Sequence, residues 1–387
     1  MIKSLFKKMG FGTNEAVALD VSSKNLTSVV AIVKAGKLLS LKQVDSVPYS
    51  GFYEGEWLDE NELKEKAYGL LQNALKDVKG KRKVLHVSVP AEFLAVNVKG
   101  VSVEYDRVRK ITSADLDYFY YKGDTFGDGE FIPINASDVA FSLDGVSNTT
   151  ESPIGEAVQK IAGEVSYVFC EKSYFSIFDE LASKLGFKET HYYATPLCEG
   201  LNIFEKEERF NEILLIDVGY LSTSVSVMKG NGLTALRSFS YGLGHIAANV
   251  YEALEIPFDD ASELIGKIDL NLNYTDEIYE TKSGYKIYMA DVASIVIDSL
   301  RVLSATIKDA IVECGYIPTP SLPFYVTGEG LELKGITKYL ERGLIKELEI
   351  VAPKNPAYNK PQNSSAISLI NIAVGIGENR AGRLIYN

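Results

Sequence analysis

Residues 213–228 have the sequence ILLIDVGYLSTSVSVM, in which an apolar run ends at Asp217 and is followed by a small-residue turn and a second β-rich run. The same arrangement occurs near the start of the chain, where the β-rich run 16–19 leads to Asp20, a polar turn follows, and residues 26–33 form a second β-rich run. Each segment predicts a β-hairpin with an aspartate at its bend. Because the arrangement recurs roughly 200 residues apart, it indicates a duplicated domain whose two copies face each other across a cleft.

The remaining elements follow from apolar spacing. Strands are expected over 38–47, 84–89, 191–194 and 324–327, with a β-rich patch near 279–288. Helices are expected over 63–78, 175–185, 196–209, 242–266, 291–314 and 367–376. Residues 94–172 differ, because strands near 96–103, 131–143 and 159–170 surround one helix that begins near Thr112 with Asp115 in a capping-box position. This stretch is therefore interpreted as an insert.

Length and composition narrow the class of protein. A chain of 387 residues with 46% hydrophobic and 24% charged residues is globular and long for one core. Its net charge of −12 excludes a general nucleic-acid role, because a phosphate backbone would be repelled. Its three widely spaced cysteines favour the reducing cytoplasm. No apolar run is long enough to span a bilayer.

Three turns could hold a nucleotide. The hairpin turns after Asp20 and Asp217 aim backbone N–H groups into the cleft, where they can bind phosphate oxygens. The two aspartates could hold a hydrated Mg²⁺ that bridges to those phosphates. The turn Gly328-Glu329-Gly330 lets backbone approach a flat base or sugar closely. For each aspartate alone, a simple turn cap is the alternative.

These residues resemble the actin/Hsp70/sugar-kinase superfamily and, within it, the FtsA-like bacterial actin homologues. The stretches 18–26, 215–223 and 325–335 match the two phosphate motifs and the adenosine motif. The position of the insert after the strand 84–89 matches an FtsA-type subdomain. The resemblance implies an α/β, duplicated actin-like (ribonuclease H-like) fold with two lobes around a nucleotide cleft, and it implies ATP and Mg²⁺ as cofactors.

By this resemblance, the domains are an N-terminal basic amphipathic segment (1–13), a first lobe (14–93 and 173–212), the insert (94–172), a second lobe (213–245 and 321–387) and a subdomain of that lobe (246–320). The implied phosphate-binding residues are Ser22, Ser23, Lys24, Asn25, Gly219, Tyr220, Leu221 and Ser222. The implied adenosine-binding residues are Gly242, Glu263, Lys267, Gly328, Glu329 and Gly330. Asp20 and Asp217 would hold Mg²⁺ through water. The alternative for Glu263 and Lys267 is a solvated ion pair.

The chain also departs from the family pattern. Ser22 stands where the first turn usually begins with glycine, and Tyr220 and Leu221 follow Gly219 where the second turn has glycines. Ser224 occupies an acidic position. Bulk at this point is expected to loosen the γ-phosphate side or abolish hydrolysis. No catalytic residue is assigned, and any ATPase activity is expected to be slow.

The resemblance implies a scaffold at the cell-division septum, cytoplasmic and peripheral on the inner face of the membrane. Such a protein would polymerise or dimerise, and it would bind the C-terminal tail of FtsZ near residues 246–320. A PilM-like adaptor of type IV pilus or secretion assembly is the first alternative. A sugar or acetate kinase is the second, although the sequence marks no general base for it.

Membrane contact is expected, if anywhere, at residues 2–9. Ile2, Leu5, Phe6 and Met9 recur at helical spacing between lysines, which is typical of a basic amphipathic helix, and a frayed terminus is the alternative. FtsA-like proteins usually end in a membrane helix, whereas residues 377–387 are too short and polar for one. The anchor is therefore expected to be absent, removed or moved to residues 2–9.

Overall fold

The computed structural model describes residues 13–34, 37–76, 78–79, 84–123, 129–149, 152–316 and 322–375. The segment 2–9, with its predicted lipid contact, and the stretch 377–387 lie outside these residues. Within the described part of the chain, no helix is long and apolar enough to cross a membrane.

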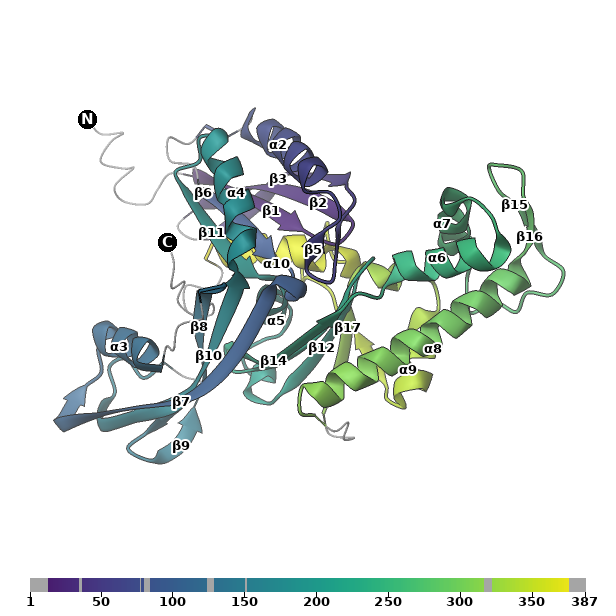
Figure 1. Cartoon of the computed structure of the whole chain (residues 1–387). Helices are drawn as coiled ribbons and strands as arrows, with labels where there is room; N and C mark the ends of the chain where they lie inside the picture. The colour runs from purple at the N-terminus through teal and green to yellow at the C-terminus, as the bar shows by residue number, and fades with distance from the viewer. Residues whose placement is uncertain are drawn as a thin grey trace.

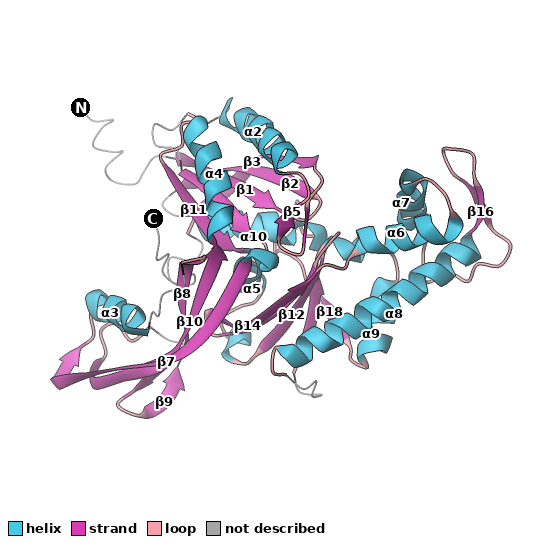
Figure 2. Cartoon of the chain, viewed as in Figure 1, coloured by secondary structure: helices cyan, strands magenta, loops and turns pink. Residues whose placement is uncertain are grey.

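The first lobe is built on a five-stranded sheet in the order β11-β6-β1-β2-β3 (Figure 1). Its strands are β1 (Thr13–Val21), β2 (Asn25–Lys34), β3 (Lys37–Pro48), β6 (Val84–Val89) and β11 (Glu189–Ala194). β1 pairs antiparallel with β2 and parallel with β6. The helices α2 (Glu60–Lys76) and α4 (Lys172–Lys184) pack on this sheet (Figure 2). Both bury the apolar face that their spacing predicts.

The second lobe repeats this sheet strand for strand, in the order β14-β13-β12-β17-β18. Its strands are β12 (Ile213–Val218), β13 (Thr223–Lys229), β14 (Gly232–Phe239), β17 (Phe324–Thr327) and β18 (Leu348–Ile350). β12 pairs antiparallel with β13 and parallel with β17, as β1 does with β2 and β6. Asp20 and Asp217 both occupy the last but one paired position of their hairpins. The predicted duplication is confirmed.

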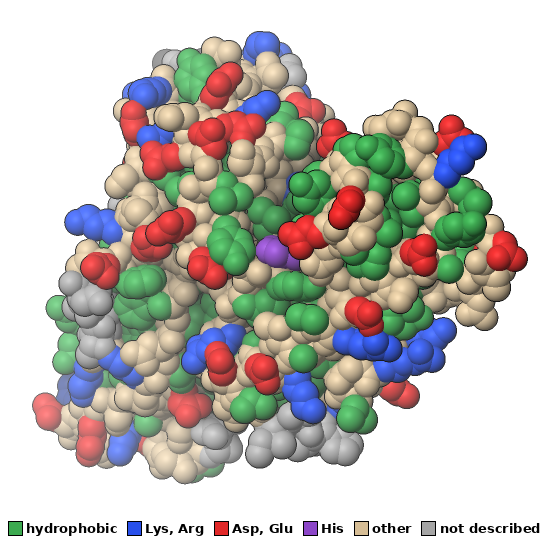
Figure 3. Space-filling view, turned by 45° about the vertical axis from the view of Figure 1, so that its right-hand side comes forward, with side chains coloured by type: hydrophobic (Ala, Val, Ile, Leu, Met, Phe, Trp, Pro, Cys, Tyr) green, Lys and Arg blue, Asp and Glu red, His purple; other side chains and the backbone are tan. Residues whose placement is uncertain are grey.

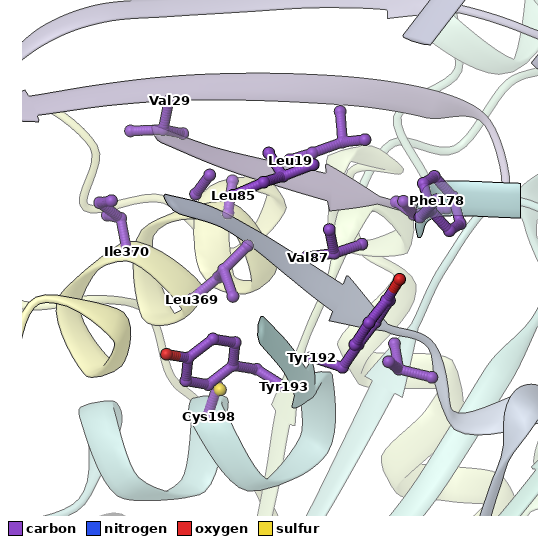
Figure 4. Packing of buried hydrophobic residues seen from close by; sticks show 14 of the residues in the cluster. Leu19, Val29, Leu85, Val87, Phe178, Tyr192, Tyr193, Cys198, Leu369 and Ile370 are labelled. Carbon is purple, nitrogen blue, oxygen red and sulfur yellow. The ribbon is translucent and has the colours of Figure 1, made fainter. Parts of the chain in front are cut away.

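Two central helices connect the lobes. α5 (Thr195–Ile203) and α10 (Ser364–Ala373) pack on each other, and α10 also packs on β1 and β6. Figure 4 shows Leu369 and Ile370 of α10 against Leu85 and Val29 of the first sheet. The predicted domain division placed 321–387 in the second lobe, whereas α10 completes the core of the first. The helix is buried on nearly all sides, so its apolar sequence gave no indication of which core it joins.

The insert forms a separate sheet with its own small core. It comprises β7 (Leu94–Lys110), α3 (Ser113–Gly123), β8 (Phe131–Leu143), β9 (Val146–Thr149) and β10 (Ala157–Glu171), in the order β7-β10-β8-β9. The predicted cap of its helix is confirmed, since the Asp115 backbone N–H donates to Thr112 Oγ1 at 3.3 Å and the Thr112 N–H donates to Asp115 Oδ2 at 2.9 Å. The sheet packs against β14 of the second lobe.

The outer part of the second lobe is mostly helical (Figure 1). It contains α6 (Leu243–Leu254), α7 (Phe258–Lys267), the short ribbon β15 (Ile278–Glu280) and β16 (Lys286–Tyr288), α8 (Met289–Glu313) and α9 (Ile336–Leu344). The single helix predicted over 242–266 is two helices, because Glu255 adopts a left-handed conformation and Pro257 precedes α7.

Short elements complete the described chain. They are β4 (Phe52–Tyr53), β5 (Glu56–Trp57) and the 3₁₀ turns η1 (Ala91–Phe93), η2 (Glu208–Phe210), η3 (Glu329–Glu332) and η4 (Pro361–Asn363). The helix predicted to reach Arg209 was too long, since α5 ends at Ile203. The buried Arg209 side chain instead donates to the carbonyl of Phe204, just past the helix end, and so fixes the chain after it.

Candidate functional site

One cavity of about 290 Å³ lies where the two hairpins face each other. It is bounded by the bend of β1–β2, the bend of β12–β13, the start of α5, η3 and the segment leading into α10. Of the sequence-predicted residues, those that line it are Asp20, Ser22, Ser23, Asn25, Asp217, Gly219, Tyr220, Ser222, Gly328 and Glu329. The structure therefore brings together both predicted metal-binding aspartates and most of both phosphate turns.

The cavity is strongly acidic. Asp20 is 4% exposed and accepts a hydrogen bond from the Ser365 hydroxyl, and burial raises its pKa despite that bond. Burial, with the charges of Asp20 and Glu329 nearby, raises the pKa of Asp217 to about 7. Because the pKa values of both Asp20 and Asp217 are raised, a bound cation would stabilise their ionised forms, and this indicates a cation site.

Sequence reasoning missed a third carboxylate in this cavity. Glu199 of α5 is 1% exposed, and burial, followed by the charge of Asp217, raises its pKa well above the ordinary value. Its Oε1 and the Thr195 Oγ1 at the start of the same helix have no hydrogen-bond partner in the described structure. The only sequence signal was a glutamate one turn after the helix-opening Pro196, a pattern common in surface helices.

The residues present fit a hydrated divalent cation. None of the described residues that line the cavity is Lys, Arg or His, and no ion pair is found for Asp20, Glu199 or Asp217 among the described residues. The described residues also contain no group of three or more His, Cys, Asp or Glu side chains placed to hold a metal directly. Carboxylates spread around a cavity suit Mg²⁺ that keeps several of its waters.

The turn 328–330 packs directly on the end of β12. Gly328 has φ +101°, and a Cβ there would lie 2.1 Å from Asp217 Oδ1. A Cβ at Gly330 would lie 2.3 Å from the Val218 side chain. Both glycines are therefore required for this close approach, and a side chain at position 328 would displace the Asp217 carboxylate.

Tyr220 and Leu221 replace glycines of the family pattern without filling the cavity. Tyr220 lines it, while both side chains pack against Gly244, where a Cβ would come within 2.9 Å of each. Leu221 Cδ1 also lies only 3.1 Å from where a Gly51 Cβ would stand. Glycines on neighbouring segments thus provide the room that these bulky residues need.

Some predicted site residues lie outside the cavity lining. Gly242 instead packs against the carbonyls of Gly219 and Tyr220, which explains the need for glycine there. Glu263 accepts a hydrogen bond from the Tyr279 hydroxyl at 2.8 Å, on the outer part of the second lobe. Lys267, at the end of the same helix, is exposed and likewise does not line the cavity. Their adenosine role remains a prediction.

Lys24 and Leu221 lie beside the cavity and join its two sides. Lys24 Nζ pairs with Glu329 Oε1 at 2.8 Å, and the Leu221 N–H donates to Ser23 Oγ at 2.9 Å. The two predicted phosphate turns are therefore bonded to each other and to the predicted adenosine turn.

Comparisons with known proteins agree on the fold. No family model matches the chain. The cell division protein FtsA of Bacillus subtilis (strain 168) is 20% identical over an alignment of 376 positions, which covers 92% of this chain and 83% of that protein. A chain of the PilM-PilN type IV pilus biogenesis complex superposes with a TM-score of 0.58 and 15% identity, covering 93% of this chain and 98% of that one.

Two further solved structures are similar at a TM-score of 0.53 and 12% identity. They are the ethanolamine utilization protein EutJ from Carboxydothermus hydrogenoformans, covering 95% of this chain and 92% of that one, and MreB5 of Spiroplasma citri bound to ADP, covering 93% and 95%. The chain therefore has the two-lobed actin-like fold, and it resembles FtsA in sequence and a PilM-PilN chain in structure.

Proposed function

We propose that this chain is an actin-like scaffold that binds ATP with Mg²⁺ in the cavity between its lobes. The observation that carries the proposal is the matched placement of Asp20 and Asp217 at the bends of two equivalent hairpins that face one cavity. A third turn, at Gly328, closes the same cavity from the second lobe. Hairpin bends of this kind can bind phosphate oxygens through backbone N–H groups.

Mg²⁺ would be held through water by Asp20 and Asp217, with Glu199 adding negative charge to the cavity. When bound, the ion would neutralise phosphate charge that these carboxylates would otherwise repel. Tyr220 and Leu221, in place of glycines, favour binding over turnover, so we expect at most slow hydrolysis.

Equilibrium binding of labelled ATP tests the proposal. We expect binding that depends on Mg²⁺ and that weakens at least roughly tenfold in Asp217→Ala, since a charge next to the ion is lost. Asp276→Ala, which removes an exposed acid of the outer second lobe, is the matched control and should bind as the wild type does. Equal affinity of the Asp217→Ala variant for ATP would contradict the proposed site.

We further propose that the scaffold resembles FtsA in its partners: it would self-associate, bind the C-terminal tail of FtsZ and link division filaments to the inner face of the membrane. Exposed apolar side chains on the outer second lobe support a peptide-binding role there (Figure 3). They include Tyr251 (45% exposed), Phe258 (41%), Ile278 (52%), Tyr285 (42%) and Tyr288 (50%). Gathered aromatic side chains are typical of interaction surfaces.

A PilM-like adaptor that binds a short cytoplasmic peptide of a pilus protein is the second candidate, and similarity to the PilM-PilN complex favours it. Fluorescence anisotropy with an FtsZ tail peptide and with a pilus-protein N-terminal peptide separates the two. Phe258→Ala should weaken binding of the true partner, while Leu39→Ala, an exposed apolar residue of the first lobe, should not. Binding of the pilus peptide alone would overturn the cell-division role.

A further inference from the structure

The two hairpin bends that face the cavity are bonded directly to each other. The backbone N–H of Leu221 donates to Ser23 Oγ at 2.9 Å, although the residues are 198 positions apart. Ser23 is 4% exposed, so the acceptor of this bond is largely shielded from water. The amide and the hydroxyl are the kinds of group that each turn would offer to a phosphate, and here they satisfy one another.

A second contact ties the first turn to the opposite side. Lys24 Nζ lies 2.8 Å from Glu329 Oε1 and 4.4 Å from the centre of the Tyr220 ring. Burial lowers the pKa of Lys24, but the pairing with Glu329 outweighs it and the net shift is upward. The one lysine of the first turn is therefore committed to a carboxylate and is not free to offset additional phosphate charge.

The first turn has little room to move away. A Cβ on Gly51 would lie 2.1 Å from the Ser23 carbonyl oxygen, which shows how closely the following segment packs on the turn. The Tyr49 hydroxyl donates to the Ser22 carbonyl at 2.8 Å. The Ser22 hydroxyl stays within its own turn, accepting from the Asn25 N–H at 3.0 Å. Of the two serines, only Ser23 joins the lobes through its side chain.

From this we infer that the clasp formed by the Ser23–Leu221 bond between the two bends occupies the place of a third phosphate, so that the cavity takes a nucleoside diphosphate in preference to a triphosphate. The inference rests on the proposed nucleotide binding. With the base at the Gly328 turn, the terminal phosphate of a triphosphate is the one farthest from that turn and enters between the two bends. A diphosphate leaves the clasp intact, whereas a triphosphate must break it.

Charge and space support the same preference. A third phosphate would bring more negative charge beside Asp20, Glu199 and Asp217, with Lys24 already paired. The cavity of about 290 Å³ is just below the roughly 300–1,000 Å³ found for small-molecule sites. Breaking one shielded hydrogen bond predicts a preference for the diphosphate of roughly five- to tenfold.

The test compares dissociation constants for ADP and ATP, each with Mg²⁺, in the wild type and two variants. We expect the wild type to bind ADP at least about fivefold more tightly than ATP. In Ser23→Ala the Leu221 N–H loses its acceptor, so the ratio should fall toward one. Ser240→Ala is the matched control, because the Ser240 hydroxyl accepts from the Glu54 N–H at 2.8 Å and so also crosses between the lobes, but away from the two bends. That control should keep the ratio of the wild type.

Hydrogen exchange of the Leu221 amide gives a second measurement that needs no nucleotide. We expect slow exchange in the ligand-free wild type and in Ser240→Ala, and faster exchange in Ser23→Ala. Wild-type affinity for ATP equal to or above that for ADP would overturn the inference and leave the nucleotide proposal standing, and so would an equal loss of preference in both variants. Absence of binding of either nucleotide would overturn the proposed function and the inference with it.

Discussion

A buried polar junction fastens the insert to the second lobe, and its removal tests how the molecule is held together. Asn231, in the β13–β14 turn, donates from Nδ2 to Asp138 Oδ2 at 2.9 Å and accepts from Arg209 Nη1 at 2.8 Å. Tyr120 of α3 donates its hydroxyl to Asp138 Oδ1 at 2.9 Å. Arg209 is fully buried, and Asp138 and Asn231 are each at least nine-tenths buried. Burial raises the pKa of Asp138 despite its partners.

Asn231→Ala removes two hydrogen bonds to charged groups, each worth about 1.5–3 kcal/mol, and leaves part of the Asp138 carboxylate without a partner. We therefore expect the free energy of unfolding to fall by about 3 kcal/mol, within the range for breaking buried charged networks. Urea unfolding followed by circular dichroism measures the change. Asn211→Ala, at an exposed position, is the control and should stay within about 0.5 kcal/mol of the wild type.

The junction also predicts which strands lose protection from hydrogen exchange in Asn231→Ala. The backbone N–H of Asn231 donates to the Asp138 carbonyl at 2.9 Å, so the turn and β8 are joined by both main chain and side chain. Hydrogen exchange should increase in β8 and β14 before it increases in β1. A Tyr120→Phe and Asn231→Ala double-mutant cycle should show coupling, since both side chains bind one carboxylate. A change below about 0.5 kcal/mol in Asn231→Ala, with no added exchange in β8, would refute the reasoning.

Three further predictions use single side chains. Burial, with a smaller effect of nearby His191, lowers the pKa of His86 to about 3. Because the unfolded chain takes up a proton below about pH 6.5 and the folded chain does not, the free energy of unfolding should fall by up to about 1.4 kcal/mol per pH unit from 6.5 toward 3. Urea unfolding repeated across pH should show a smaller slope in His86→Phe. Burial and, to a lesser extent, the charge of Glu54 raise the pKa of Glu92 to about 7. The stability that protonated Glu92 provides below about pH 4.5 should therefore be lost as pH rises through 7. The melting temperature of Glu92→Gln should exceed that of the wild type at pH 8 but not at pH 4. Gly328→Ala, at φ +101° and against Asp217, should cost at least about 2 kcal/mol in urea unfolding, whereas Gly69→Ala in α2, where a Cβ meets nothing within 4 Å, should stabilise by up to about 1 kcal/mol.

The hairpins and the duplicated sheet could be predicted because their signals are local. An apolar run that ends in aspartate, a turn and a second apolar run fix a hairpin, and repetition of that pattern implies two equivalent sheets. The positions of Asp20 and Asp217 at the bends of the two hairpins were therefore predicted correctly. Their shared cavity is a consequence of how two correctly predicted units face each other.

The parts that could not be predicted depend on packing between distant segments. α10 is buried on nearly every side, so its sequence indicated burial but not that it joins the first lobe. Glu199 is a glutamate in the second turn of a helix, and only the packing of α5 and α10 encloses it. Glu263 has a helix-surface pattern that fits either a ligand contact or a local bond, and in the structure it bonds to Tyr279.

Tyr220 and Leu221 show why a departure from a family motif has to be judged with its surroundings. From sequence, their bulk was expected to loosen the γ-phosphate side of the cleft or to abolish hydrolysis. In the structure the Leu221 side chain is held between the Gly51 and Gly244 backbones, and this fixes the residue whose amide bonds to Ser23. A glycine in the same place would have no side chain to hold, and its amide would be free to turn toward a ligand. The Leu221 side chain, which departs from the glycine of the family motif, therefore positions the bond between Leu221 and Ser23 that joins the lobes.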